Sequence, residues 1–175
     1  MLGEAMATEI LTLEALLDRV PRHARLFGLD LGTKTIGIAI SDVERRIASP
    51  LETIRREKFS IDVKKLDALA SKHAIYALVM GLPLNMDGSE GPRVQATRAF
   101  VRNMSNFMSL PVLYWDERLS TAAVTRSLIE QDASRAKRAQ VVDRMAAAYI
   151  LQGALDRMNT IVRQKSPPPQ REGLI

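Results

Sequence analysis

The sequence predicts an α/β fold in which one mixed, five-stranded sheet is flanked by helices. Three strand-like segments follow one another at short spacing, and two more alternate with segments of helical periodicity. Short links favour an antiparallel meander, whereas a strand–helix–strand order favours right-handed crossovers between parallel strands. The length of 175 residues favours one principal domain.

The expected strands are short apolar runs bounded by turn residues. The first is apolar except for Asp30, and Gly32-Thr33-Lys34 forms the turn after it. The five predicted strands cover residues 26–31, 35–41, 48–54, 77–80 and 112–115.

Five further segments have the spacing or the caps of helices. Thr8 and Ser60 are the expected caps of the first two, and Ser120 is the expected cap of the fourth. The predicted helices cover residues 8–20, 61–73, 92–108, 120–130 and 141–158. A polar, basic stretch over 131–140 predicts a mobile loop. We therefore expect an N-terminal helical extension over 1–24, the main domain over 25–159 and a disordered tail over 160–175.

The composition restricts the chemistry. There is no cysteine, which excludes disulfides and thiolate metal sites, and there are only two histidines. A catalytic metal would therefore need oxygen ligands, which favours Mg²⁺ or Mn²⁺. No apolar run approaches the ~20 residues that span a bilayer, and the acidic N-terminus does not resemble a signal peptide. We expect a cytoplasmic protein without a membrane segment.

The net charge of +5 is unevenly distributed. Residues 1–117 carry 15 basic and 15 acidic side chains, whereas residues 118–175 carry 10 basic and 5 acidic ones. A basic C-terminal third favours a polyanionic partner such as nucleic acid. The alternative interpretation is a solvated basic surface.

Three positions offer carboxylates for a site. Asp30 lies inside an apolar strand, where a charge is costly unless it is paired or bound to a metal, although it could also cap the following turn. Asp116 and Glu117 end a strand and should face opposite ways, so only one of them can join a given site. Asp143 opens the last predicted helix, where the helix dipole alone would favour it. Carboxylates on two strands and a helix could hold two metal ions for phosphodiester hydrolysis.

Four segments in order resemble motifs of the YqgF family, also called RuvX-like Holliday junction resolvases, whose bacterial members are described as pre-16S rRNA nucleases. The opening motif is Gly-Leu-Asp-Leu-Gly-Thr-Lys-Thr-Ile-Gly-Ile-Ala-Ile-Ser-Asp at 28–42. The others are Gly-Leu-Pro-Leu-Asn-Met-Asp-Gly-Ser-Glu at 81–90, Asp-Glu-Arg-Leu-Ser-Thr at 116–121 and Val-Asp-Arg-Met-Ala-Ala-Ala-Tyr-Ile-Leu-Gln at 142–152. The similarity covers about 25–158.

The resemblance implies a ribonuclease H-like fold and a metal-dependent endonuclease that matures the 5′ end of 16S rRNA with Mg²⁺ or Mn²⁺. It assigns the catalytic, metal-binding carboxylates to Asp30, Glu117 and Asp143. Tyr149 and Trp115 are bulkier than the family pattern, and neither change touches the three acids.

Six further residues are candidates for substrate binding. Lys34 and Arg118 could hold a phosphate, although Arg118 could instead form a surface salt bridge. Asn85 lies in a loop that could contact substrate or simply form a turn. Arg135, Lys137 and Arg138 form a basic cluster that we expect to touch the nucleic-acid backbone, the alternative being a solvated loop.

Three other functions compete with rRNA processing. Branched DNA is the alternative substrate, and junction resolvases usually act as symmetric dimers; we expect a monomer or a weak dimer. An actin-like or sugar-kinase-like phosphotransferase would need a second Asp-x-Gly turn, and this chain has only the one at Asp30. A nucleic-acid-binding regulator that cuts nothing would not need three carboxylates. The expected partners are pre-rRNA or branched DNA and the precursor of the small ribosomal subunit.

Overall fold

The computed structural model describes residues 7–119, 135–166 and 168, and over 135–143 it describes the backbone alone. Five strands form one mixed sheet in the order β3-β2-β1-β4-β5. They are β1 (Arg25–Leu31), β2 (Thr35–Ser41), β3 (Ala48–Arg55), β4 (Ile75–Leu82) and β5 (Val112–Asp116). β1 pairs antiparallel with β2 and parallel with β4. β2 pairs antiparallel with β3, and β4 pairs parallel with β5. This confirms the predicted five-stranded mixed sheet, and each strand boundary lies within two residues of its predicted position.

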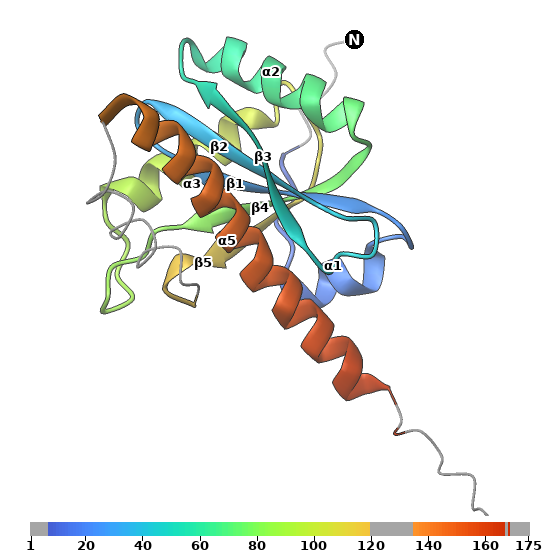
Figure 1. Ribbon diagram of the computed structural model, residues 1–175. Coiled ribbons are helices and arrows are strands. Elements are labelled where there is room, and N and C mark those ends of the chain that lie inside the picture. The colour runs from blue at the N-terminus through green and yellow to red at the C-terminus, as the bar shows by residue number, and fades with distance from the viewer. Residues whose placement is uncertain (1–6, 120–134, 167, 169–175) are drawn as a thin grey trace, which may run out of the picture.

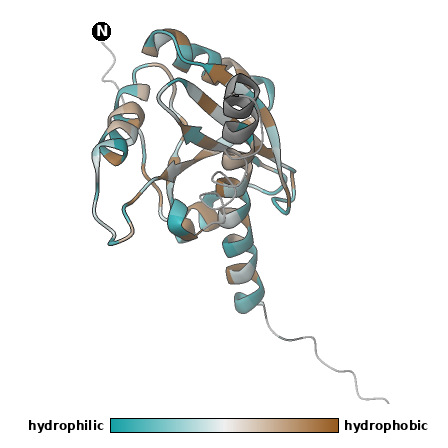
Figure 2. Cartoon of the chain, turned by 60° about the vertical axis from the view of Figure 1, so that its left-hand side comes forward, coloured by the Kyte–Doolittle hydropathy of each residue, from teal (hydrophilic) through white to brown (hydrophobic). Residues whose placement is uncertain are grey.

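Helices cover both faces of the sheet, and Figure 1 shows α5 crossing one face and extending beyond it. The helices are α1 (Leu13–Arg19), α2 (Phe59–Lys72), α3 (Pro92–Met104) and α5 (Arg135–Lys165), with a 3-10 turn η1 (Glu117–Leu119) after β5. Hydrophilic and hydrophobic residues alternate along the described parts of these helices (Figure 2), as expected for helices with one face on the sheet and one in solvent. In the described ranges, no helix is both long and apolar enough to cross a membrane.

The two faces of β1 enter two separate hydrophobic cores because side chains alternate along a strand. Phe27 and Leu29 lie in the core with the buried residues of α2 and α3. Leu26 lies in the other core, together with Leu16 of α1 and Leu151 of α5. Leu26 and every second residue after it on β1 therefore face α5, and we call this face the α5 side of the sheet.

α5 is longer than predicted at both ends. Residues 135–140, expected in a mobile loop, are helical, and they are Arg, Ala, Lys and Gln, which all favour helices. Residues 160–165, expected in a disordered tail, also belong to the helix, where Ile161 is buried. The tail therefore cannot begin at 160. The helix expected over 120–130 lies outside the described residues.

The N-terminal segment packs against the sheet. Its helix begins at Leu13 because Thr12, not Thr8, accepts a hydrogen bond from the Ala15 amide (3.2 Å). Before the helix, the Leu11 amide donates to the Val112 carbonyl and the Val112 amide donates to the Glu9 carbonyl, both at 2.8 Å. The predicted helical extension is thus partly extended chain beside β5.

Two other helix ends differ from the prediction. Lys58, not Ser60, occupies the N-cap position of α2, and Asp62 accepts a hydrogen bond from the Glu57 amide (3.0 Å). α3 ends at Met104 rather than Met108, and the amide of Met108 donates back to the Met104 carbonyl (3.1 Å).

Candidate active site

Two of the three predicted carboxylates are buried at the same end of the sheet, where β1 and β5 finish. Asp30 is near the end of β1 and is 2% exposed, and Glu117 directly follows β5 and is 8% exposed. Burying a charged carboxylate is costly unless hydrogen bonds, a cation or a metal compensates. Their burial at the carboxyl ends of parallel strands is typical of a functional site in an α/β protein.

Both side chains belong to the α5 side of the sheet. On β1, Asp30 follows Leu26 by four residues, so its side chain faces the same side of the sheet as Leu26, which packs in the α5-side core. On β5, Leu113 and Trp115 pack in the same core, and Glu117 is the next residue with this alternation. Asp116 has the opposite alternation, so the structure separates the two neighbouring acids.

Gly81 of β4 makes room for the Glu117 carboxylate. A Cβ atom on Gly81 would lie 2.7 Å from Glu117 Oε1 and 2.5 Å from Ile150 Cδ1 of α5. Gly81 pairs with Trp115 on one side, while Met80 just before it pairs with Leu29, the residue before Asp30. Gly81 therefore occupies the strand between the two carboxylates. Sequence reasoning did not single it out, although its place in the Gly-Leu-Pro turn after an apolar strand was the available signal.

A second glycine lets α5 approach β1 closely. A Cβ atom on Gly28 would lie 2.6 Å from Leu151 Cβ and 2.7 Å from the Ala147 carbonyl oxygen. Farther along α5, Asn159 Nδ2 donates to the Arg45 carbonyl (3.0 Å) in the β2–β3 turn, which lies at the amino end of β1. α5 therefore begins near the carboxyl end of β1 and runs toward its amino end.

This direction places the backbone of Asp143, one helical turn before Ala147, toward the end of the sheet that carries Asp30. The side chain of Asp143 is outside the described set. Among the side chains that are described, no group of three acidic or histidine residues could hold a metal ion. The structure thus shows the side chains of Asp30 and Glu117 on one side of the sheet, and it shows the backbone of Asp143 toward the same end of the sheet.

Arg118 joins Asp116 to the loop after β4. Its Nε and Nη2 donate to the Asp116 carboxylate at 3.0 and 2.7 Å, and its Nη1 donates to the Met86 carbonyl at 3.3 Å. The Arg118 hydrogen bond, opposed by burial, holds the pKa of Asp116 below its ordinary value. The surface salt bridge considered for Arg118 is therefore present, and it anchors the loop beside Glu117.

The loop around Asn85 is a well-formed turn. Asn85 Nδ2 donates to Ser89 Oγ (2.9 Å), and the Gly88 amide donates to the Asn85 carbonyl (2.8 Å). Gly88 has φ +84°, a conformation that favours glycine. At the tip, the Met86 side chain is 91% exposed.

The remaining predicted substrate residues are basic. Lys34 is exposed in the β1–β2 turn, which the Gly32 amide closes by donating to the Thr35 carbonyl (2.9 Å). Arg135, Lys137 and Arg138 belong to the first turns of α5, and their side chains are outside the described set. The cluster is therefore on a helix rather than in the predicted loop.

Comparison with known proteins identifies the family. The RuvX family model, described as Holliday junction resolvase, matches residues 24–157. A protein of Methylocella silvestris named "Putative pre-16S rRNA nuclease" is 69% identical over 89% of this chain and 97% of its own length. A protein of Beijerinckia indica with the same name is 67% identical over 87% of this chain and 93% of its own.

Solved structures of resolvases are also similar. Thermus thermophilus RuvC in complex with Holliday junction substrate has a TM-score of 0.47 and 15% identity, covering 79% of this chain and 98% of that chain. Nucleases and resolvases of the family generally use divalent metal ions. On its family match and its sequence relatives, the chain belongs to the RuvX family of nucleases.

Proposed function

We propose that the protein is a metal-dependent endonuclease that processes the 5′ end of pre-16S rRNA during ribosome biogenesis in the cytoplasm. The observation that carries the proposal is the burial of Asp30 and Glu117 on one face of the sheet, with Gly81 clearing the space between their strands. We take pre-16S rRNA as the substrate because two similar proteins bear the name "Putative pre-16S rRNA nuclease". Asp143 is the third proposed carboxylate.

The donor set fits a hard divalent cation. Asp30 and Glu117 supply carboxylate oxygens, the ligands preferred by Mg²⁺ and Mn²⁺. When bound, such an ion polarises the scissile phosphate and lowers the pKa of the attacking water. Asp30 at the end of β1, Glu117 in the η1 turn after β5 and Asp143 in the first part of α5 would hold it.

Residues around the carboxylates would position the substrate. Lys34 follows Asp30 by four residues and is exposed, so its ammonium group can approach a phosphate. The hydrogen bonds of Arg118 to Asp116 and Met86 hold the Asn85 turn beside Glu117. The guanidinium group of Arg118 has more N–H donors than these bonds use. We assign all three to substrate binding.

The first turns of α5 would add contacts to the nucleic-acid backbone. We expect a variant with Arg135, Lys137 and Arg138 all changed to alanine to bind RNA more weakly. The slope of log K against log salt concentration should become shallower by about 3, because about three phosphate contacts are lost. An unchanged affinity and salt slope would contradict this assignment.

Cleavage of two substrates tests the proposed function. An RNA spanning the 5′ end of pre-16S rRNA and a four-way DNA junction are each incubated with Mg²⁺, Mn²⁺ or a chelator. We expect metal-dependent cleavage of the RNA by the wild type and by the control Asp67→Asn on α2, and none by Asp30→Asn. No metal-dependent cleavage of the RNA would refute the proposal.

The description of the matching family model supports one alternative substrate, branched DNA. Cleavage of the junction alone would select it. Because two strands of a junction must be cut, activity on a junction would also require a dimer, whereas we expect a monomer or a weak dimer on RNA. Sedimentation with each substrate separates these cases.

A further inference from the structure

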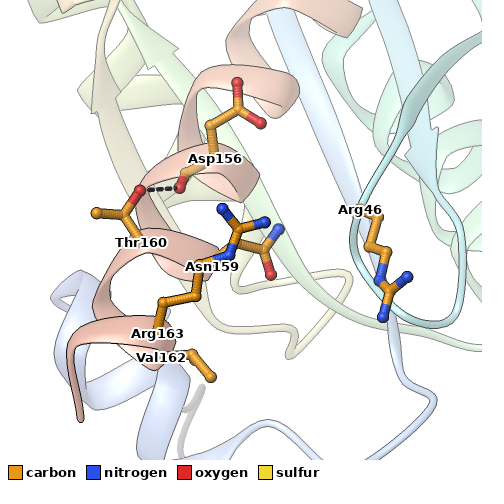
Figure 3. A pocket seen from close by; sticks show the side chains of 6 residues that line it. All are labelled: Arg46, Asp156, Asn159, Thr160, Val162 and Arg163. Carbon is orange, nitrogen blue, oxygen red and sulfur yellow. Dashed lines mark hydrogen bonds between the residues drawn. The ribbon is translucent and has the colours of Figure 1, made fainter. Parts of the chain in front are cut away.

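A polar hollow lies between the last turns of α5 and the β2–β3 turn, at the opposite end of the sheet from Asp30 (Figure 3). Its volume is about 610 Å³. The lining residues are Arg46, Asp156, Asn159, Thr160, Val162 and Arg163. In Figure 3, Arg46 projects from the β2–β3 turn on one side of the hollow, and the other labelled residues belong to α5 on the opposite side.

Hydrogen bonds fix the two walls relative to each other. Gln152 of α5 donates to the Arg46 carbonyl (2.9 Å) and accepts from the Ala48 amide (2.8 Å). Asn159 donates to the Arg45 carbonyl (3.0 Å), and the Arg45 guanidinium donates to the Ala24 carbonyl (2.8 Å). The hollow is therefore preformed rather than a gap between independent segments.

The charge of the hollow favours an anion. Its one carboxylate, Asp156, accepts a hydrogen bond from Gln152 (2.9 Å). Arg46 pairs with Glu44 at 3.4 Å, but their side chains are 72% and 55% exposed, so solvent weakens this pair. Arg163 is exposed and forms no salt bridge within the described ranges. Two guanidinium groups thus remain accessible to a phosphate, with which arginine makes strong, directional hydrogen bonds.

The distance from the candidate active site suggests the source of the phosphate. Asn159 and Arg163 follow Asp143 on the same helix by 16 and 20 residues. At about 1.5 Å per residue this separates them from the proposed site by about 24–30 Å along the helix. Such a span corresponds to about 9–11 base pairs of A-form RNA duplex at ~2.8 Å per pair, or to about 7–9 base pairs of B-form DNA at ~3.4 Å per pair.

We propose that this hollow binds backbone phosphates in a duplex arm of the substrate, about one turn away from the cut. The proposal rests on the proposed function for the identity of the substrate. It predicts that Arg46 and Arg163 act only on substrates whose arm is long enough to reach them. They contribute to substrate selection by arm length.

Binding in chelator tests the proposal without cleavage. The probes are RNA hairpins with stems of about 6 and about 16 base pairs that share the same loop and single-stranded end. We expect the double variant Arg46→Ala, Arg163→Ala to raise the Kd for the long stem roughly tenfold and to lower its salt slope by about 2. The Kd for the short stem should not change. Arg157→Ala is the matched control, because Arg157 is an exposed arginine of α5 outside the hollow.

Two results would overturn the proposal: equal loss of affinity for both stems, or a double variant that binds the long stem as Arg157→Ala does. Replacing both arginines by lysine should restore most of the salt slope, because lysine keeps the charge. If the wild type cuts neither substrate but the arm-length effect is present, the proposed function fails while the phosphate site stands. Cleavage with no arm-length effect would give the reverse conclusion.

Discussion

The Glu117 carboxylate occupies the space that a side chain at Gly81 would fill. In Gly81→Ala, the new methyl group would collide with Glu117 Oε1 and Ile150 Cδ1, at 2.7 and 2.5 Å. We expect a stability loss of about 1–3 kcal/mol from overpacking and a fall in single-turnover cleavage of roughly 10²-fold, because displaced carboxylates no longer hold the reacting groups.

Gly91→Ser is the matched control for this substitution. The three atoms nearest to a Cβ atom on Gly91 would all belong to Asn85, the closest at 3.4 Å, which is ordinary contact, and serine is favoured at the N-cap position that Gly91 occupies. This variant should retain both activity and stability. If Gly81→Ala cleaved as fast as Gly91→Ser, the role assigned to the space above Gly81 would be wrong.

Asp42 closes the β2–β3 turn and gives the fold a defined pH dependence. Its carboxylate accepts hydrogen bonds from the amides of Arg46 and Ile47, at 2.7 and 2.9 Å. Burial raises the pKa of Asp42, but these and neighbouring amides lower it by more, so that its pKa lies below the ordinary 3.8. The charged form therefore stabilises the fold above pH 3.8, and this contribution is lost as the pH falls through the lower folded-state pKa.

We expect Asp42→Ala to lower the free energy of unfolding by about 1–2 kcal/mol at neutral pH, with the difference shrinking in acid below pH ~3.8. Urea unfolding at neutral pH and below pH ~3.8 measures this difference in free energy. Asp18→Ala, on the exposed surface of α1, serves as the control. A difference that stayed constant with pH would mean that the Asp42 charge does not stabilise the turn.

At the scale of elements, the N-terminal segment is part of the α5-side core. Leu16 of α1 is fully buried, whereas Ile10 beside β5 is 50% exposed. Leu16→Ala should destabilise the protein by about 2–5 kcal/mol, because it leaves a cavity between α1 and α5, whereas Ile10→Ala should cost less than ~1 kcal/mol. Denaturant midpoints of the two variants measure this, and similar midpoints would show that α1 does not contribute to the core.

The strands were predictable because each is an apolar run bounded by turn residues, and this pattern is visible without tertiary contacts. Helix ends were less predictable. Thr8 and Thr12 are both plausible caps, and the hydrogen bonds of Glu9 and Leu11 to Val112, which accompany the start of the helix after Thr12, are tertiary contacts that the sequence pattern does not reveal. The start of α5 was missed because its basic first turns resemble a loop in composition.

The candidate site was predictable in part for similar reasons. Asp30 stands out because it interrupts an apolar strand. Strand alternation separates Glu117 from Asp116, but the choice between them came from the family resemblance. Gly81 could not be identified as a site residue, because its role depends on the approach of β5 and α5 to the same point.

For the whole molecule, a bound divalent ion should couple catalysis to stability. Asp30 and Glu117 are both buried, and a cation would offset the cost of keeping their charges. Mg²⁺ or Mn²⁺ at ~100 times its Kd should stabilise the wild type by about 2.7 kcal/mol, which raises the thermal midpoint. Asp30→Asn should lose this metal response, whereas Asp67→Asn should keep it. An equal metal response in Asp30→Asn would exclude Asp30 as a ligand.

The hydrogen bonds of Glu9 and Leu11 to Val112 also affect how the molecule behaves among its own copies. β5 is one outer strand of the sheet, and an outer strand with free backbone groups is a template on which another chain can add a strand. Here the chain's own N-terminal segment occupies the start of that edge. At the opposite edge, β3 carries Pro50 and a register shift between its partners Ile38 and Ala39. The N-terminal segment that completes the core therefore also shortens the free edge of β5 on which another chain could add a strand.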